Sequence, residues 1–348
     1  MSAVSIHGAD QILRPPQDGL PYLRHDRAGD LTLEPGAVRV EGGRIAGFEP
    51  DAGAAVQIDA AGGAVVPGFV DCRTALPFAW APDASDATIL RQSRELAAEM
   101  LRDGTTALEL RGAGPRGLRL AARLAGTAQQ ATAITAAVGP EELARAVAES
   151  RARALSLPAE QVREHGRLAR SHDVWLRVDA GEEVLPALGF GARAVEGLTE
   201  LRAADIAPLA DAESAAVLLP VAELLHAEHL APGRRLADAG AICVLATGCD
   251  PRESPSASLP LAIGLAARLY GWSACEALLA CTLNAAWVLG LHDTLGSLEP
   301  GKHADLLVLD GPVEALPHRL GRSPVAVVIR SGELVHVRAD QAWRVTGA

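Results

Sequence analysis

The chain has 348 residues, of which 49% are hydrophobic and 22% are charged, and its net charge is −11. This composition is typical of a globular protein with a large core, and the acidic balance argues against binding of nucleic acid through its phosphates. No apolar run reaches the ~20 residues that span a bilayer, and residues 1–15 lack the pattern of a signal peptide. We therefore expect a cytoplasmic protein with no membrane segment.

The predicted elements fall into two groups, one at the chain ends and one in the middle. Residues 37–49 alternate around Gly42-Gly43 and residues 325–337 around Ser331-Gly332, so both ends predict a hairpin. Between them, short apolar runs alternate with helical segments. The predicted strands are 64–70, 105–110, 131–138, 174–180, 192–198, 214–221 and 241–248, and the predicted helices are 86–102, 116–126, 140–154, 158–170, 258–270 and 274–289.

This alternation predicts an α/β fold with a (β/α)8 TIM-type barrel, assigned to residues 64–296. The two terminal hairpins predict a small β-sandwich domain formed by both chain termini, assigned to residues 1–63 and 297–348. The pattern shows seven barrel strands, so the eighth is either disguised or lost. A doubly wound open sheet is the alternative architecture.

Several motifs carry a family resemblance. Residues 65–76 read VVPGFVDCRTAL and residues 296–310 read GSLEPGKHADLLVLD. Both stretches resemble the two ends of the barrel in the amidohydrolase superfamily. Residues 103–110 (DGTTALEL), 231–240 (APGRRLADAG) and 282–286 (TLNAA) are similar to its imidazolonepropionase branch. The resemblance covers the whole chain and implies the barrel fold and an ancestral hydrolysis of a C–N bond in a cyclic amide.

The same resemblance identifies the positions at which that branch binds its catalytic metal. The family uses a His-x-His pair on the first strand, histidines on the fifth and sixth strands, and an Asp at the end of the eighth. In this chain the corresponding positions are Arg73, Ala75, Asp179, Gly197 and Gly248. A guanidinium puts a permanent positive charge where a cation would lie. The resemblance therefore implies no metal cofactor, no catalytic residues and no cyclic-amide hydrolysis, because the metal-activated water is lost.

Three interpretations follow from this loss. In the first, the protein is retained as a binding or partner protein, with a small polar ligand and a homodimeric assembly implied by the resemblance. In the second, it is a C–N hydrolase with an altered or displaced metal site, in which oxygen ligands hold Mg²⁺ or Mn²⁺. In the third, it is a relic whose pocket is filled by apolar side chains.

Each interpretation names its own residues. The candidate pocket residues are Asp71, Arg111, Cys249 and Asp250. The displaced metal site would use Asp71, Asp179 and Asp250. We also expect Arg73 and Asp179 to form an ion pair in the vacated metal site.

Other motifs have simpler explanations. His226 and His229 lie one helical turn apart, which is typical of a solvated helix face when no carboxylate completes a metal site. The glycines at 112, 114 and 117 resemble a dinucleotide loop, but no acidic residue ends a strand about twenty residues later. The five cysteines form no CxxC pair, so we expect packing residues rather than a thiolate metal site.

Overall fold

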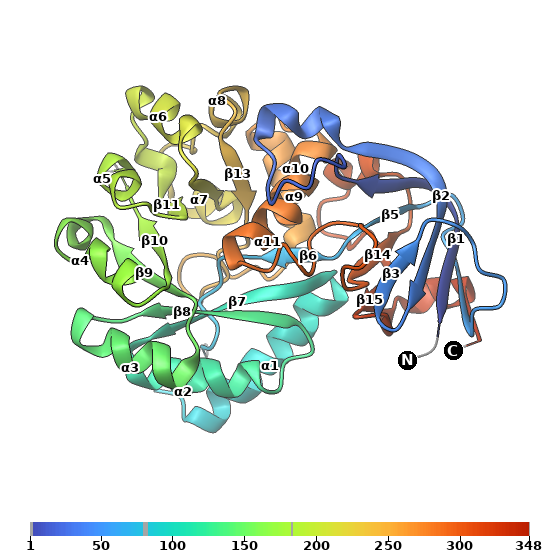
Figure 1. Cartoon of the computed structure of the whole chain (residues 1–348), viewed down its shortest axis with the longest axis horizontal. Helices are drawn as coiled ribbons and strands as arrows, with labels where there is room; N and C mark the ends of the chain where they lie inside the picture. The colour runs from blue at the N-terminus through green and yellow to red at the C-terminus, as the bar shows by residue number, and fades with distance from the viewer. Residues whose placement is uncertain (1–2, 79–82, 182–183, 348) are drawn as a thin grey trace.

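The computed structural model describes residues 3–78, 83–181 and 184–347. It contains an eight-stranded parallel barrel and a nine-stranded sheet to which both ends of the chain contribute (Figure 1). This confirms the predicted barrel with an additional β-structure from the termini. None of the described helices is both long enough and apolar enough to cross a bilayer.

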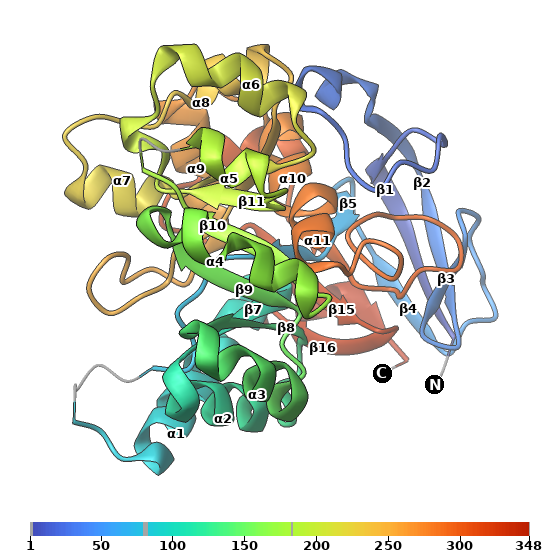
Figure 2. The same ribbon diagram turned by 60° about the vertical axis from the view of Figure 1, so that its left-hand side comes forward.

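The barrel strands follow one another in chain order and in space. They are β6 (Phe69–Asp71), β7 (Thr105–Ala113), β8 (Ala131–Ala137), β9 (Ala154–Pro158), β10 (Trp175–Asp179), β11 (Ala194–Glu196), β12 (Ala215–Leu218) and β13 (Ile242–Leu245). Helices surround this ring (Figure 2), except that the last of them, Leu283–Leu289, packs in one cluster with the barrel residues Val70, Ala107 and Val244. The helices are α1 (Asp86–Arg102), α2 (Gly114–Ala125), α3 (Pro140–Ser150), α4 (Ala159–Ser171), α5 (Val184–Gly189), α6 (Ile206–Asp211), α7 (Pro220–His226), α8 (Gly233–Asp238), α9 (Leu259–Leu269), α10 (Ala274–Cys281) and α11 (Leu283–Leu289).

Strand β9 is the barrel strand that the sequence pattern did not reveal. Its first and last residues were assigned to the ends of two predicted helices, 140–154 and 158–170, and residues 155–157 to the connection between them, which is wrong. The strand is only five residues long, and Leu155 and Leu157 are buried while Ser156 is half-buried. So short an alternation gives a weak signal between two helices. Strand β9 pairs with β8 and β10 and completes the eight strands.

Two predicted elements are each divided in the structure. The run 64–70 becomes β5 (Ala64–Pro67) in the terminal sheet and β6 in the barrel, with Gly68 between them. A side chain at Gly68 would collide with Thr106, so the change of sheet requires glycine there. The predicted helix 274–289 breaks at Thr282, whose backbone is not helical. Its predicted capping box, between Ser273 and Glu276, is confirmed.

The terminal sheet joins residues that are far apart in the chain. Its strands are β1 (Val4–Arg14), β2 (Thr32–Glu41), β3 (Arg44–Gly47), β4 (Val56–Asp59), β5, β14 (Leu306–Leu309), β15 (Val325–Arg330), β16 (Glu333–Val337) and β17 (Val345–Thr346). The two predicted hairpins are the pairs β2–β3 and β15–β16. One set of buried side chains from β1, β2, β14 and β15 forms a core of its own, whereas Leu307, Leu309 and Val328 pack into the core that includes the barrel.

The barrel closes just beyond the ends of its first and last strands. Thr74 and Cys249 form a parallel bridge there. The Gly248 N–H donates to the carbonyl of Arg73 at 3.0 Å, and the Ala75 N–H donates to that of Cys249 at 2.8 Å. This closure brings the segments after β6 and β13 together at the C-terminal end of the barrel, which is the functional face of such folds.

Candidate functional site

Strand β6 ends in a carboxyl group that water cannot reach. Asp71 accepts hydrogen bonds from the Thr247 hydroxyl at 2.5 Å, from the Thr247 N–H at 3.3 Å and from the Arg73 N–H at 3.3 Å. Its side chain is fully buried. Burial raises the pKa of Asp71 to about 7, although the hydrogen bonds from Thr247 and Arg73 oppose the shift. Asp71 therefore connects the first and last barrel strands rather than facing a ligand.

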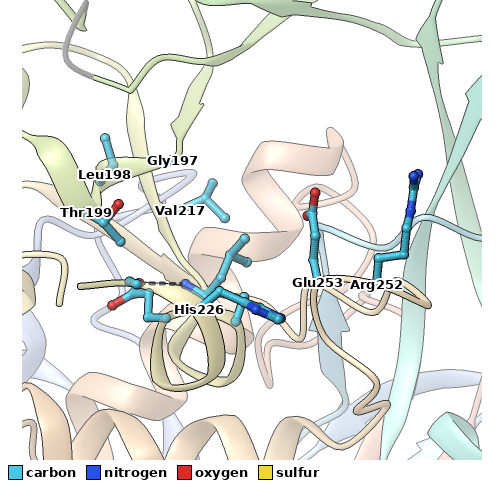
Figure 3. Close-up of a pocket in the computed structure, with 11 residues that line it drawn as sticks. Gly197, Leu198, Thr199, Val217, His226, Arg252 and Glu253 are labelled. Atoms are coloured by element: carbon cyan, nitrogen blue, oxygen red, sulfur yellow. Dashed lines mark hydrogen bonds between the residues drawn. The ribbon is translucent and has the colours of Figure 1, made fainter. Parts of the chain in front are cut away.

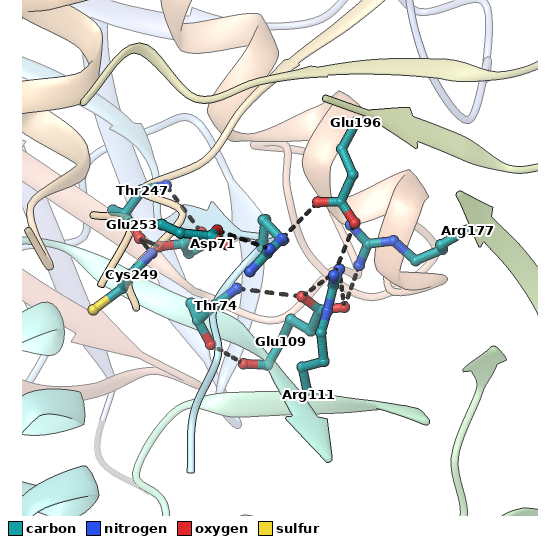
Figure 4. A network of polar contacts seen from close by, with 10 residues as sticks. Asp71, Thr74, Glu109, Arg111, Arg177, Glu196, Thr247, Cys249 and Glu253 are labelled. Carbon is teal, nitrogen blue, oxygen red and sulfur yellow. Dashed lines mark hydrogen bonds and ion pairs between the residues drawn. The ribbon is translucent and has the colours of Figure 1, made fainter. Parts of the chain in front are cut away.

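A network of charged side chains crosses the barrel mouth (Figure 4), and Arg73 belongs to it through its ion pair with Glu196. Its Nε donates to Glu196 at 2.5 Å, and Glu196 also accepts from Arg111 Nη1 at 2.8 Å. Arg111 contacts Glu109 at 3.3 Å, and Glu109 forms an ion pair with Arg177. Thr74 donates its N–H to the Glu109 carboxylate and its hydroxyl to the Glu109 carbonyl. Five charged side chains from four strand ends are thus joined.

The ion pair expected between Arg73 and Asp179 is not formed. Arg73 pairs with Glu196 on the neighbouring strand β11, and its Nη2 lies 3.6 Å from Glu253. Asp179 and Glu196 are register partners of β10 and β11, so the two carboxylates compete for one guanidinium. Glu196 forms ion pairs with two guanidiniums, those of Arg73 and Arg111. This double pairing favours Glu196 over Asp179 as the partner of Arg73.

The charged side chains of this network interact strongly because they are shielded from water. The side chains of Glu109 and Glu196 are 0% and 4% exposed. Burial alone would raise the pKa of Glu196, but the guanidiniums of Arg111, Arg73 and Arg177 hold it well below the ordinary value. Glu196 therefore stays ionised at neutral pH.

The other positions implied by the family resemblance are occupied by small residues and one carboxylate. Ala75 and Gly248 only supply backbone groups to the barrel closure. Gly197 has φ +74°, and the Asp179 carboxylate lies where a Gly197 side chain would be. Asp179 is accessible to solvent, but partial desolvation by its neighbours raises its pKa, as do the charges of Glu196 and Glu253, while Arg73 and Arg111 oppose them. Among the described residues, Asp179 has no ion-pair partner.

The described donor groups at the barrel mouth do not converge on a common point. Within the described ranges, no three His, Cys, Asp or Glu side chains come close enough to hold one. The alternative set of Asp71, Asp179 and Asp250 does not converge either. Asp71 is committed to Thr247, and Asp250 accepts from the N–H groups of Arg252 and Glu253 in a turn. The side chain at Arg73 is a cation, which repels a metal.

Cys249 lacks the properties of a nucleophile. It is buried, and burial raises its pKa to about 12. A thiol with that pKa carries almost no thiolate at neutral pH.

The glycines at 112 and 117 serve packing, because a side chain at Gly112 would collide with the backbone of Leu118. No observation on these residues supports dinucleotide binding.

A pocket of about 330 Å³ opens beside this network (Figure 3). It is lined by the segments that follow β11, β12 and β13. Leu198, Val217, Leu219 and Ala222 supply apolar walls, and Thr199, His226 and Glu253 supply polar groups. His226 is the last residue of α7, and His229 lies beyond the helix and outside the pocket lining, so the pair does not share a helix face.

Three residues of the network were missed by sequence reasoning. Glu109 and Arg177 lie inside β7 and β10 and Glu196 ends β11, each next to buried apolar residues of its strand. A charged residue in such a run is rarely buried without a partner. That mismatch was the available signal, and it would have predicted a buried charge network.

Comparisons with known proteins agree with the fold. The Amidohydrolase family matches residues 64–337. The imidazolonepropionase of Mycolicibacterium smegmatis is 32% identical over 372 aligned residues, covering 88% of this chain and 93% of that protein. That of Salinispora arenicola is 32% identical, with coverages of 85% and 91%.

Solved structures show the same architecture. An adenosine deaminase from Xanthomonas campestris with bound zinc superposes with a TM-score of 0.73 at 21% identity, covering 95% of this chain and 92% of that one. A triazine hydrolase variant gives a TM-score of 0.76 at 17% identity, with coverages of 96% and 94%. At these identities the likeness shows the fold alone.

Proposed function

Because this chain belongs to the amidohydrolase family, we propose that it is an imidazolonepropionase-like member without the family's metal site. In this proposal it binds a small polar ligand at the barrel mouth and does not hydrolyse a cyclic amide. The observation that carries the proposal is the fixed Arg73 guanidinium, which Glu196 holds at 2.5 Å where the resemblance places a metal ligand.

The chemistry of the remaining side chains supports the loss of hydrolysis. Attack on a cyclic amide needs an activated water and a group that stabilises the developing negative charge. A guanidinium stays protonated at neutral pH and cannot act as a general base. Glu109 and Glu196 are held by arginines, so their lone pairs are occupied by hydrogen bonds. Asp71 is enclosed and contacts no open space.

The open pocket supports a binding role over a relic. A relic is expected to have a mouth filled by apolar side chains, whereas this one has a pocket of about 330 Å³ with polar groups at its edge. That volume lies at the lower end of the usual range for small-molecule sites, roughly 300–1,000 Å³. The charge network adjoins the pocket, because Glu253, which lines it, lies 3.6 Å from Arg73.

A hydrolysis assay tests this proposal. The protein would be assayed on the cyclic-amide substrate of the Mycolicibacterium smegmatis relative, before and after addition of Zn²⁺, Fe²⁺ or Mn²⁺. The relative, prepared and assayed in parallel, is the positive control. We expect no turnover above the uncatalysed rate with any metal. Turnover that appears with one metal and disappears with a chelator would contradict the proposal.

A further inference from the structure

The charges at the barrel mouth leave two carboxylates without a strong ion pair. Three buried or half-buried guanidiniums (Arg73, Arg111 and Arg177) face four carboxylates (Glu109, Glu196, Glu253 and Asp179). Asp71 is not counted because it is enclosed with Thr247, and Glu223 is not counted because it accepts the N–H groups of Leu219 and Ala231. Arg252, which also lines the pocket, is exposed to solvent. The strong pairs use all three guanidiniums on Glu109 and Glu196. Within the part of the chain that the structure describes, Asp179 and Glu253 are left with no ion pair shorter than 3.6 Å.

These two carboxylates lie next to the pocket. The Asp179 carboxylate packs over the Cα of Gly197, which lines the pocket, and Glu253 itself lines it. The charge of Glu253 is among the groups that raise the pKa of Asp179, although partial desolvation and Glu196 contribute more. Both residues are exposed, so a ligand can reach them. A cation that contacts both carboxylates would relieve their repulsion.

The other residues that line the pocket restrict the size and polarity of the rest of the ligand. Leu198, Val217 and Leu219 form apolar walls, which favour a hydrocarbon body. A cavity of about 150 Å³ is sufficient for benzene, so about 330 Å³ holds one ring and a polar group. Arg252 also lines the pocket, but it lies on the far side of Glu253 from Thr199 and Val217 (Figure 3). It is exposed, so solvent screens its charge.

We propose that this pocket takes a small organic cation, an ammonium or amidinium group on a compact hydrocarbon body, with Asp179 and Glu253 as its counter-ions. This inference rests on the proposed function, because it names the ligand class of the same pocket. The net charge of −11 adds a field that attracts cations to the molecule.

Three probes of one shape and different charge test the inference. Benzamidinium is the cation, benzamide its neutral counterpart and benzoate the anion, and isothermal titration calorimetry measures their affinities. We expect benzamidinium to bind about tenfold more tightly than benzamide, with benzoate weakest, and its affinity to fall as salt is added. Asp179→Asn and Glu253→Gln should each weaken benzamidinium binding about tenfold. Glu228→Gln, which removes an exposed carboxylate outside the pocket lining, should leave it unchanged.

The outcomes that contradict this inference differ from the outcome that contradicts the proposed function. Equal affinities for the three probes, equal effects of all three variants, or no binding at millimolar concentration would each overturn the inference. Benzamide or benzoate bound more tightly than benzamidinium would also overturn it, while leaving the binding role standing. The same protein sample would be analysed for metal and hydrolysis, and chelator-sensitive turnover there would overturn the proposed function instead.

Discussion

Replacing Glu196 by Gln tests whether the charge network holds the barrel mouth together. Glu196 accepts charged hydrogen bonds from Arg73 at 2.5 Å and Arg111 at 2.8 Å, and its side chain is 4% exposed. Hydrogen bonds to charged groups contribute roughly 1.5–3 kcal/mol each, so their combined loss is about 3–6 kcal/mol. Removing one partner of a buried ion pair lowers the free energy of unfolding by about 3–5 kcal/mol, which is an independent measure of the same loss. Since Gln retains one acceptor oxygen, we expect a loss of about 3 kcal/mol.

Urea unfolding at pH 7, followed by circular dichroism, measures this loss. The matched control is Glu253→Gln, because Glu253 is 62% exposed and lies 3.6 Å from the same Arg73. Exposed pairs contribute about 0–1 kcal/mol, so this variant should unfold almost like the parent. If the two variants lose equal free energy of unfolding, the reasoning about burial is wrong.

The pH dependence of the same variant provides a second measure. Because the pKa of Glu196 is lower in the folded protein than in the unfolded chain, its contribution to stability is present above the ordinary glutamate pKa of about 4.3. That contribution is lost as the pH falls through the lower, folded pKa. The difference in unfolding free energy between the parent and Glu196→Gln should therefore shrink below about pH 4.3. A difference that stays constant in this range would contradict the assignment.

Three further predictions concern other described residues. Burial lowers the pKa of His25 from 6.5 to about 4. The free energy of unfolding should therefore fall by about 3 kcal/mol between pH 6.5 and pH 4. In urea titrations, His25→Asn should make this fall with pH smaller. Gly197→Ala should lower stability by about 1–3 kcal/mol and weaken benzamidinium binding, whereas Gly271→Ala, with φ +70° but open space around it, should lower stability alone. Cys249 should react with Ellman's reagent only after unfolding, and half-buried Cys275 should react first; rapid native labelling of Cys249 would contradict its burial.

Much of the fold could be predicted because its signals are local. Alternation around Gly42-Gly43 and Ser331-Gly332 predicted both terminal hairpins, and Ser273 with Glu276 predicted the start of α10. Strand β9 was missed since five residues between two helices carry little periodicity. The division of the run 64–70 could not be predicted, because it depends on the contact of Gly68 with Thr106 in another strand.

The candidate site was predicted only in part, because its contacts link distant strands. Sequence reasoning selected Arg73, Arg111 and Asp179, which do lie at the barrel mouth. It chose the wrong partner for Arg73, since Asp179 and Glu196 end adjacent strands and differ mainly in how many guanidiniums reach them. That number depends on Arg111, whose direction is set by the pleat of β7 and by its partners across the barrel.

The metal content of the protein tests the central claim most directly. Protein purified without chelator, then incubated with Zn²⁺, Fe²⁺ or Mn²⁺ and desalted, would be analysed by plasma mass spectrometry. Since Arg73 and Glu196 form a buried ion pair where the family resemblance places the metal, we predict far less than one equivalent of each metal and no rise in thermal stability. One tightly held equivalent per chain, with higher thermal stability, would contradict the account.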